Sequence, residues 1–165
     1  MRLEGIRSVS PFCGPIQRAI HYLKYRHGYA LAEPLGELMA EYWQKHPLPA
    51  DVIVPVPLHP SRLRARGYNQ AALLVWALAR RIGLPVDEEA LFRVRATASQ
   101  MRLKAGDRRR NVQDAFYCPP SRMDGRRVLL IDDVCTTGAT LEACADVLRA
   151  GGARAVWALT LARAF

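Results

Sequence analysis

The sequence lacks any apolar run approaching the roughly 18 residues that a membrane-spanning helix needs. Its beginning, MRLEGIRSVSPF, also lacks the apolar core of a secretion signal. We therefore expect a cytoplasmic protein. Half of the 165 residues are hydrophobic and 24% are charged. This balance is typical of a globular chain rather than a disordered one, and the length fits one domain.

The sequence has only four cysteines, and no two of them stand at the close spacing of a metal-binding pair. The residues Cys13, Cys118, Cys135 and Cys144 contain no C-x-x-C spacing among them. A zinc site built from this chain alone is therefore not expected. Nothing indicates export, so a disulfide framework is not expected either, and we interpret the thiols as free and mostly buried.

Several nucleotide-binding motifs are missing as well. The sequence contains neither G-x-x-x-x-G-K-[ST] nor G-x-G-x-x-G, which argues against a nucleotide P-loop and a dinucleotide-binding fold. An acid pair near the chain start, as a phospho-receiver domain would place it, is also missing. Internal repeats and low-complexity tracts are not present, so the chain is expected to be continuous.

Lysine is rare, but positive charge is not. The net charge of +9 comes from 21 arginines and 3 lysines, 24 together, against 15 acidic residues. The excess forms two clusters, one at Arg62, Arg64 and Arg66 and the other running from Arg93 to Arg110. One such cluster is as often a solvated face as a binding site. Two clusters in one domain indicate an anionic ligand, either a polyphosphate or a nucleic-acid backbone.

Hydrophobic spacing predicts helices and strands in alternation. The expected helices are Pro15–Arg26, Tyr29–Lys45, Tyr68–Ile82 and one carrying Leu141, Cys144, Ala145 and Leu148. The expected strands are Asp51–Pro57, Ala90–Val94, Ala115–Cys118, Arg127–Asp132 and Ala155–Ala162. Strands that are continuously apolar and alternate with helices favour an α/β fold with a mostly parallel sheet.

The stretch VLLIDDVCTTGAT, Val128–Thr140, carries the chemistry. It places two acids at the end of an apolar strand, where parallel sheets bind their ligands. Because neighbouring strand residues point to opposite faces, Asp132 and Asp133 cannot have the same role. One acid would accept hydrogen bonds from ligand hydroxyls, while the other would approach the reacting centre or a metal.

The loop after the two acids is suited to an anion. Thr136, Thr137 and Thr140 offer hydroxyls, and Gly138 and Ala139 leave room at the start of a helix, where free N–H groups favour phosphate. Taken singly, a pair of acids at a strand end or a Thr-Thr-Gly helix start is more often a structural cap. Together and in this order they predict a site for a ribose 5-phosphate.

This string resembles the signature of the type I phosphoribosyltransferases, which bind phosphoribosyl pyrophosphate (PRPP). Within that superfamily the chain is similar to the ComF competence family. The resemblance extends over nearly the whole chain from Gly14, including the stretches Gly14–Gly36, Val54–Ala71, Arg93–Phe116 and Leu159–Arg163. It implies a central, mostly parallel sheet of about five strands, flanking helices and a small hood over the site.

The resemblance also implies roles for individual residues. Asp132 and Asp133 would be the catalytic acids and bind the ribose hydroxyls, and Cys135 to Thr140 would hold the 5-phosphate. A pyrophosphate loop would include Leu58, His59 and Arg62. A flexible basic loop at 95–111 would close over PRPP with Gln100, Arg108 and Asn111. Mg²⁺ would be bound mainly through PRPP itself, with no protein ligand assigned.

Members of the family usually begin with a cysteine-rich zinc ribbon. This sequence starts at about the point where the ribbon would end, so either the ribbon is lost or the start codon has been placed late. We expect residues 1–13 to be a remnant of, or a junction to, the missing ribbon, and we expect no zinc. Residues 1–165 would form one phosphoribosyltransferase-like domain. The position of Cys135 inside the phosphate loop is interpreted as a small tolerated residue rather than a reactive thiol.

Two functions remain open from the sequence. The chain could be an enzyme that transfers a phosphoribosyl group and releases pyrophosphate, linked to DNA uptake, natural competence or nucleotide salvage. Alternatively, it could be a non-catalytic module that binds single-stranded DNA, through the arginine clusters and Tyr68, Phe116 and Tyr117, or that binds DNA-uptake or helicase partners. The residues assign no acceptor base. They set no oligomeric state, although a dimer is compatible with them.

Overall fold

The structure is a computed structural model that describes residues 2–96, 104, 106–107, 112 and 114–165. Four strands form the central sheet in the order β1-β6-β5-β2, and every neighbouring pair is parallel. Their bounds are β1 Gly5–Pro11, β2 Val52–Pro55, β5 Arg127–Cys135 and β6 Ala155–Arg163. The α/β fold class predicted from the sequence is confirmed, with four strands in the described part of this sheet rather than about five.

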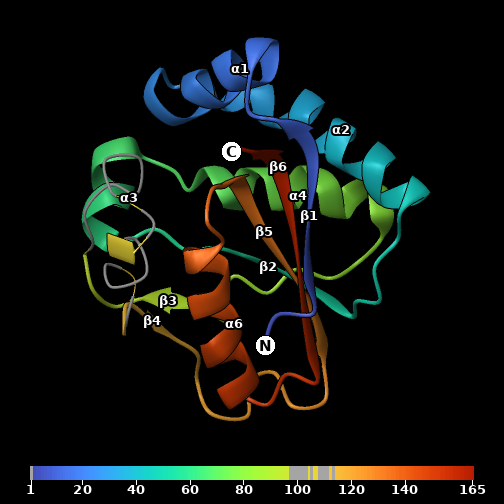
Figure 1. Ribbon diagram of the computed structural model, residues 1–165, viewed down its shortest axis with the longest axis vertical. Coiled ribbons are helices and arrows are strands. Elements are labelled where there is room, and N and C mark those ends of the chain that lie inside the picture. The colour runs from blue at the N-terminus through green and yellow to red at the C-terminus, as the bar shows by residue number, and fades with distance from the viewer. Residues whose placement is uncertain (1, 97–103, 105, 108–111, 113) are drawn as a thin grey trace.

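Helices cover both faces of the sheet (Figure 1). The helices α1 Gly14–Tyr25, α2 Ala32–Lys45 and α4 Gln70–Ile82 cover one face, and α6 Ala139–Ala150 covers the other. The short 3₁₀ turn η1 Tyr29–Leu31 precedes α2, and α3 Pro60–Arg66 lies to one side of the sheet and buries none of its residues. A separate two-stranded antiparallel sheet pairs β3 Phe92–Arg93 with β4 Phe116–Tyr117. None of the helices in the described ranges is long and apolar enough to cross a membrane.

Alternate residues of each strand feed two hydrophobic cores, as strand geometry requires. On β5, Val128 and Leu130 face the core that α6 covers, whereas Leu129 and Ile131 face the core under α1, α2 and α4. Both faces of the strand are therefore buried, which explains its continuous apolar run. The same alternation sets the direction of each acid that follows.

Close helix packing on the second face depends on a small residue. A Cβ added to Gly36 of α2 would lie 2.3 Å from the Cβ of Ala77 in α4. The two helices therefore approach each other at a point where neither carries a large side chain. This packing fixes α4, whose first turn reaches the ligand pocket described below.

Two described elements were not expected from the sequence. β1 lies within residues 1–13, and it pairs with β6 at the edge of the sheet. Its sequence, GIRSVSP, has no apolar run because an edge strand is only half buried. Helix α3 is only seven residues long, too short for its periodicity to stand out from the loop predicted around Leu58.

Candidate ligand site

A cavity of about 260 Å³ lies at the carboxyl ends of β2 and β5, and we call it the strand-end pocket. It exists because β2 ends early. Pro55 is the last residue of β2 and pairs with Ile131, whereas β5 continues to Cys135. Asp132 and Asp133 therefore belong to β5 itself. They lie beyond the last residue of β5 that pairs with β2, so β2 does not cover this edge of the strand.

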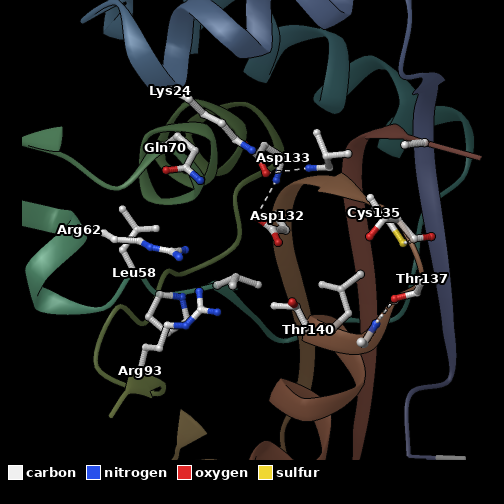
Figure 2. Close-up of a pocket in the computed structure, with 18 of the residues that line it drawn as sticks. Lys24, Leu58, Arg62, Gln70, Arg93, Asp132, Asp133, Cys135, Thr137 and Thr140 are labelled. Atoms are coloured by element: carbon white, nitrogen blue, oxygen red, sulfur yellow. Dashed lines mark hydrogen bonds and ion pairs between the residues drawn. The ribbon is translucent and has the colours of Figure 1, made fainter. Parts of the chain in front are cut away.

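The two acids point to different surroundings, as their positions on the strand predict. Asp133 is buried, and its Oδ2 lies 3.1 Å from Nζ of Lys24 at the end of α1 (Figure 2). Asp132 is only half-buried, and its Oδ1 accepts a hydrogen bond of 2.9 Å from the backbone N–H of Asp133. Both line the pocket, but Asp132 is the more open to a ligand.

The surroundings shift the pKa values of the two acids, Asp132 and Asp133, in opposite directions. Although part of Asp132 faces the pocket, the protein atoms around its carboxyl group keep water away, and this desolvation, followed by the negative charge of Asp133, raises its pKa well above the usual range. Burial acts most strongly and would raise the pKa of Asp133, but the attraction of Lys24 and the hydrogen bonds from Asp132, Lys24 and the backbone of Val134 together outweigh it, and the pKa is lowered. The pKa of Lys24 is raised because the two acids overcome the effect of its own burial. Asp133 and Lys24 are therefore a charged pair, and Asp132 has a stronger tendency to hold a proton.

The loop that follows the acids leads into the amino end of α6. Gly138 has a φ of +86°, a left-handed conformation that L side chains rarely adopt, and an added Cβ would lie 3.1 Å from Cδ1 of Ile6. The hydroxyl of Thr137 accepts a hydrogen bond of 3.3 Å from the N–H of Ala139. Every residue from Cys135 to Thr140 lines the strand-end pocket.

Basic side chains line the wall opposite Asp132. Arg62 from α3 and Arg93 from β3 lie across the pocket from that acid, and Gln70 lies between Arg62 and Lys24 (Figure 2). Arg66 also lines the pocket and donates a hydrogen bond to Oε1 of Gln70. Arg62 from the first arginine cluster of the sequence and Arg93 from the start of the second therefore meet at one cavity, although they are distant in the chain.

The predicted pyrophosphate loop is only partly on the pocket. Leu58 and Arg62 line it. His59 instead acts in the structure as the N-cap of α3, since its Nδ1 accepts from the N–H of Ser61 at 3.2 Å. The three residues proposed for the flexible loop, Gln100, Arg108 and Asn111, lie outside the described residues.

Three important pocket residues were not singled out from the sequence. Lys24 is one of three lysines, but its partner is over a hundred residues away, so only the fold reveals the ion pair. Gln70 is 5% exposed at the start of an otherwise apolar helix, which is a weak signal of a polar site. Tyr25 borders the pocket and follows Lys24 directly.

The aromatic residues suggested for DNA stacking do not share one environment. Phe116 is buried beneath Arg93, whose guanidinium carbon lies 5.0 Å from the ring centroid. The hydroxyl of Tyr68 donates to the carbonyl of Leu23. Of these three, only Tyr117 is among the large exposed side chains. Stacking on Phe116 would therefore require the core to open.

Comparison with known proteins assigns the family. A model of the phosphoribosyl transferase domain matches residues 69–164, more than half of the chain. DNA utilization protein YhgH of Salmonella typhi is 38% identical over 97% of this chain and 72% of its own length. Competence protein F of Haemophilus influenzae is 35% identical over 94% of this chain and 71% of its own. The chain belongs to the ComF family of the phosphoribosyltransferase superfamily.

Solved structures support the fold of this ComF-family chain. Glutamine PRPP amidotransferase from B. subtilis matches 86% of it with a TM-score of 0.59 and 19% identity. An allosteric regulatory enzyme of purine biosynthesis matches 79% with a TM-score of 0.55 and 20% identity. The ComF-family chain covers only 30% and 26% of those two chains. At these identities the likeness concerns the shared fold alone.

Proposed function

We propose that the strand-end pocket binds PRPP and that the protein transfers or recognises its phosphoribosyl group. The observation that supports this is the arrangement around one cavity. An open carboxylate, Asp132, lies between an anion-binding loop at the start of α6 and a wall of arginines. This arrangement matches a sugar that carries a phosphate at one end and a pyrophosphate at the other. The loop would face the phosphate, the carboxylate would face the sugar hydroxyls, and the arginines would face the pyrophosphate.

In this proposal each part of the pocket has its own role. The carboxylate of Asp132 accepts hydrogen bonds from the ribose hydroxyls, and Asp133 supports it from the buried side. The loop from Cys135 to Thr140 holds the 5-phosphate with backbone N–H groups and the threonine hydroxyls. Arg62 and Arg93 attract the pyrophosphate.

Mg²⁺ fits the pocket only as a partner of the ligand. Within the described ranges, no three His, Cys, Asp or Glu residues form a group that could hold a metal. Asp132 offers a hard oxygen ligand, and Mg²⁺ is commonly bound by one or two carboxylates together with phosphate oxygens. Mg²⁺ bound this way would neutralise charge on the pyrophosphate.

A transfer would break the bond between ribose C1 and the pyrophosphate oxygen. The electron pair leaves with pyrophosphate, and C1 passes through an oxocarbenium-like state that the nearby carboxylates stabilise. A nitrogen lone pair of an acceptor then forms the new bond with inversion at C1. The arginine wall lowers the energy of the departing anion by placing positive charge beside it.

Calorimetric titration with PRPP and Mg²⁺ tests the binding site. We expect the wild type to bind and Asp132→Asn with Asp133→Asn to lose binding. Asp146→Asn, on the exposed side of α6, is the matched control and should bind as the wild type does. A wild type that does not bind PRPP would refute the proposal. Pyrophosphate release against a panel of bases then separates transfer from recognition.

We also propose that this activity belongs to DNA uptake or DNA utilisation in the cytoplasm. The support is the names of the relatives, which describe DNA utilization and competence proteins. If single-stranded DNA is itself a ligand, affinity should fall steeply with the logarithm of salt concentration, because bound phosphates release counterions. If the protein shows no salt-dependent binding of single-stranded DNA, then PRPP is the ligand through which it would act in DNA uptake or utilisation.

A further inference from the structure

A second cavity, of about 370 Å³, opens between the end of α1 and α3. We call it the junction pocket. Its lining residues are Lys24, Tyr25, His27, Arg62, Ala65, Arg66 and Tyr68. Four of them, Lys24, Tyr25, Arg62 and Arg66, also line the strand-end pocket. A molecule in the junction pocket would therefore lie directly beside a ligand held at Asp132.

The junction pocket is positively charged. Two arginines, a lysine and a histidine are among its seven described lining residues, and none of the seven is acidic. Lys24 is already paired with Asp133. Arg66, in contrast, donates to the neutral side chain of Gln70 and lies over the ring of Tyr25, so neither of these contacts cancels its charge. An anionic group is the ligand that such a wall favours.

The junction pocket also has aromatic walls, formed by Tyr25 and Tyr68. The guanidinium carbon of Arg66 lies 5.6 Å from the centroid of the Tyr25 ring, which is 55% exposed. Tyr68 is held by its hydrogen bond to Leu23, and Tyr29 meets its ring edge-on with centroids 5.9 Å apart. Planar aromatic and guanidinium groups favour a planar ring between them.

We propose that the junction pocket binds the acceptor of the phosphoribosyl group, and that this acceptor is a planar heteroaromatic ring carrying a carboxylate. The inference rests on the proposed function, because it places the ring beside bound PRPP. The carboxylate would pair with Arg66, and the ring would lie against Tyr25. The lone pair of a ring nitrogen would then bond to ribose C1 as pyrophosphate leaves with the electrons of the broken bond.

Ligand pairs that differ in charge test this directly. Nicotinate and nicotinamide share one ring, as do orotate and uracil, but only the first of each pair carries a carboxylate. Each would be titrated calorimetrically into the wild-type protein with PRPP and Mg²⁺ present and, separately, absent. We expect at least one carboxylate to bind about tenfold or more tightly than its neutral partner, as for a charge-assisted hydrogen bond.

Two matched variant pairs locate the site. Arg66→Gln should lose about tenfold in affinity for the carboxylate, whereas Arg64→Gln, in the same last turn of α3 but outside both pockets, should not. Ala65 lines only the junction pocket. Ala65→Asp should repel the carboxylate, and Ala65→Asn, of nearly the same shape, should repel it much less.

The outcomes separate the two proposals. If PRPP binds and the paired rings bind equally or not at all, the junction-pocket inference is overturned. Binding of single-stranded DNA that Arg66→Gln abolishes, with no carboxylate selectivity, would overturn it in favour of a nucleic-acid surface. If PRPP does not bind but the carboxylates do, with the predicted dependence on Arg66 and Ala65, the PRPP proposal fails while the anion-selective pocket stands.

Discussion

Asp132 and Asp133 are neighbours in the sequence but occupy different electrostatic environments. Lys24 holds Asp133 as a buried ion, whereas Asp132 lies on the pocket wall with a raised pKa. A buried ion pair is costly to break because the remaining charge loses both water and its partner. The ion pair with Lys24 therefore holds Asp133 in its buried position, whereas Asp132 stays open to a ligand.

Replacing Lys24 by methionine should destabilise the protein at neutral pH by about 3 kcal/mol, because Asp133 would be left charged and unpartnered. In the wild type, the lowered pKa of Asp133 contributes stability above its unfolded pKa that is lost as pH falls through the folded value. In the variant, burial would raise that pKa, so the destabilisation should shrink as pH falls. Urea unfolding at several pH values measures both effects.

Lys45→Met is the matched control, since Lys45 is exposed in the last turn of α2 just as Lys24 lies in the last turn of α1. We expect little change in the free energy of unfolding for that variant. Lys24→Arg should recover part of the lost stability. A Lys24→Met protein as stable as the wild type across this pH range would show that the pair contributes nothing to the fold.

Among the elements, the turn between β5 and α6 is the one that we propose as the 5-phosphate site. It joins a strand end to a helix start within the residues Thr136, Thr137 and Gly138. Gly138 adopts a positive φ and packs close to Ile6 of β1. An unexpected edge strand thus contacts the predicted phosphate loop, and the two elements are distant in sequence.

Gly138→Ala should cost about 1–2 kcal/mol of stability, because an L side chain is strained at this positive φ. It should also weaken binding of PRPP, because strain at this φ and the close approach to Ile6 disturb the backbone that we propose holds the 5-phosphate. Gly83→Ala is the control: Gly83 has a φ of +74° but no atom within 4 Å of an added Cβ. Both variants should lose stability in urea, but only Gly138→Ala should lose affinity in calorimetry. Equal affinity for both would argue against a phosphate seat at this turn.

At the scale of the whole molecule, the fold collects charge at one place. The chain carries a net charge of +9, and arginines from α3 and β3 converge on the strand-end pocket. Such a concentration of positive charge raises the local concentration of an anionic ligand and steers its approach. An anionic ligand at this pocket, which the basic clusters of the sequence indicate, stays a prediction.

Thiol labelling reports on the packing of the whole fold. Cys118, Cys135 and Cys144 are buried, and burial raises the pKa of each thiol, whereas Cys13 is exposed. A colorimetric thiol reagent should therefore modify one cysteine rapidly in the native protein and all four in urea. Cys13→Ser should remove the rapid phase. More than one rapid thiol in the wild type would mean that a core around the other cysteines opens readily.

The α/β class, most helices and strands, and the order of apolar strand, two acids and Thr-Thr-Gly loop within Val128–Thr140 can be predicted from the sequence, because they depend on local periodicity and on residues adjacent in the chain. The partner of Asp133, the second cavity and the place of β1 depend on how distant segments pack together. Lys24 meets Asp133 because α1 packs across the sheet, and no local pattern encodes that approach. Arg62 and Arg93 converge for the same reason: their distance in space depends on the fold and not on their separation in the sequence.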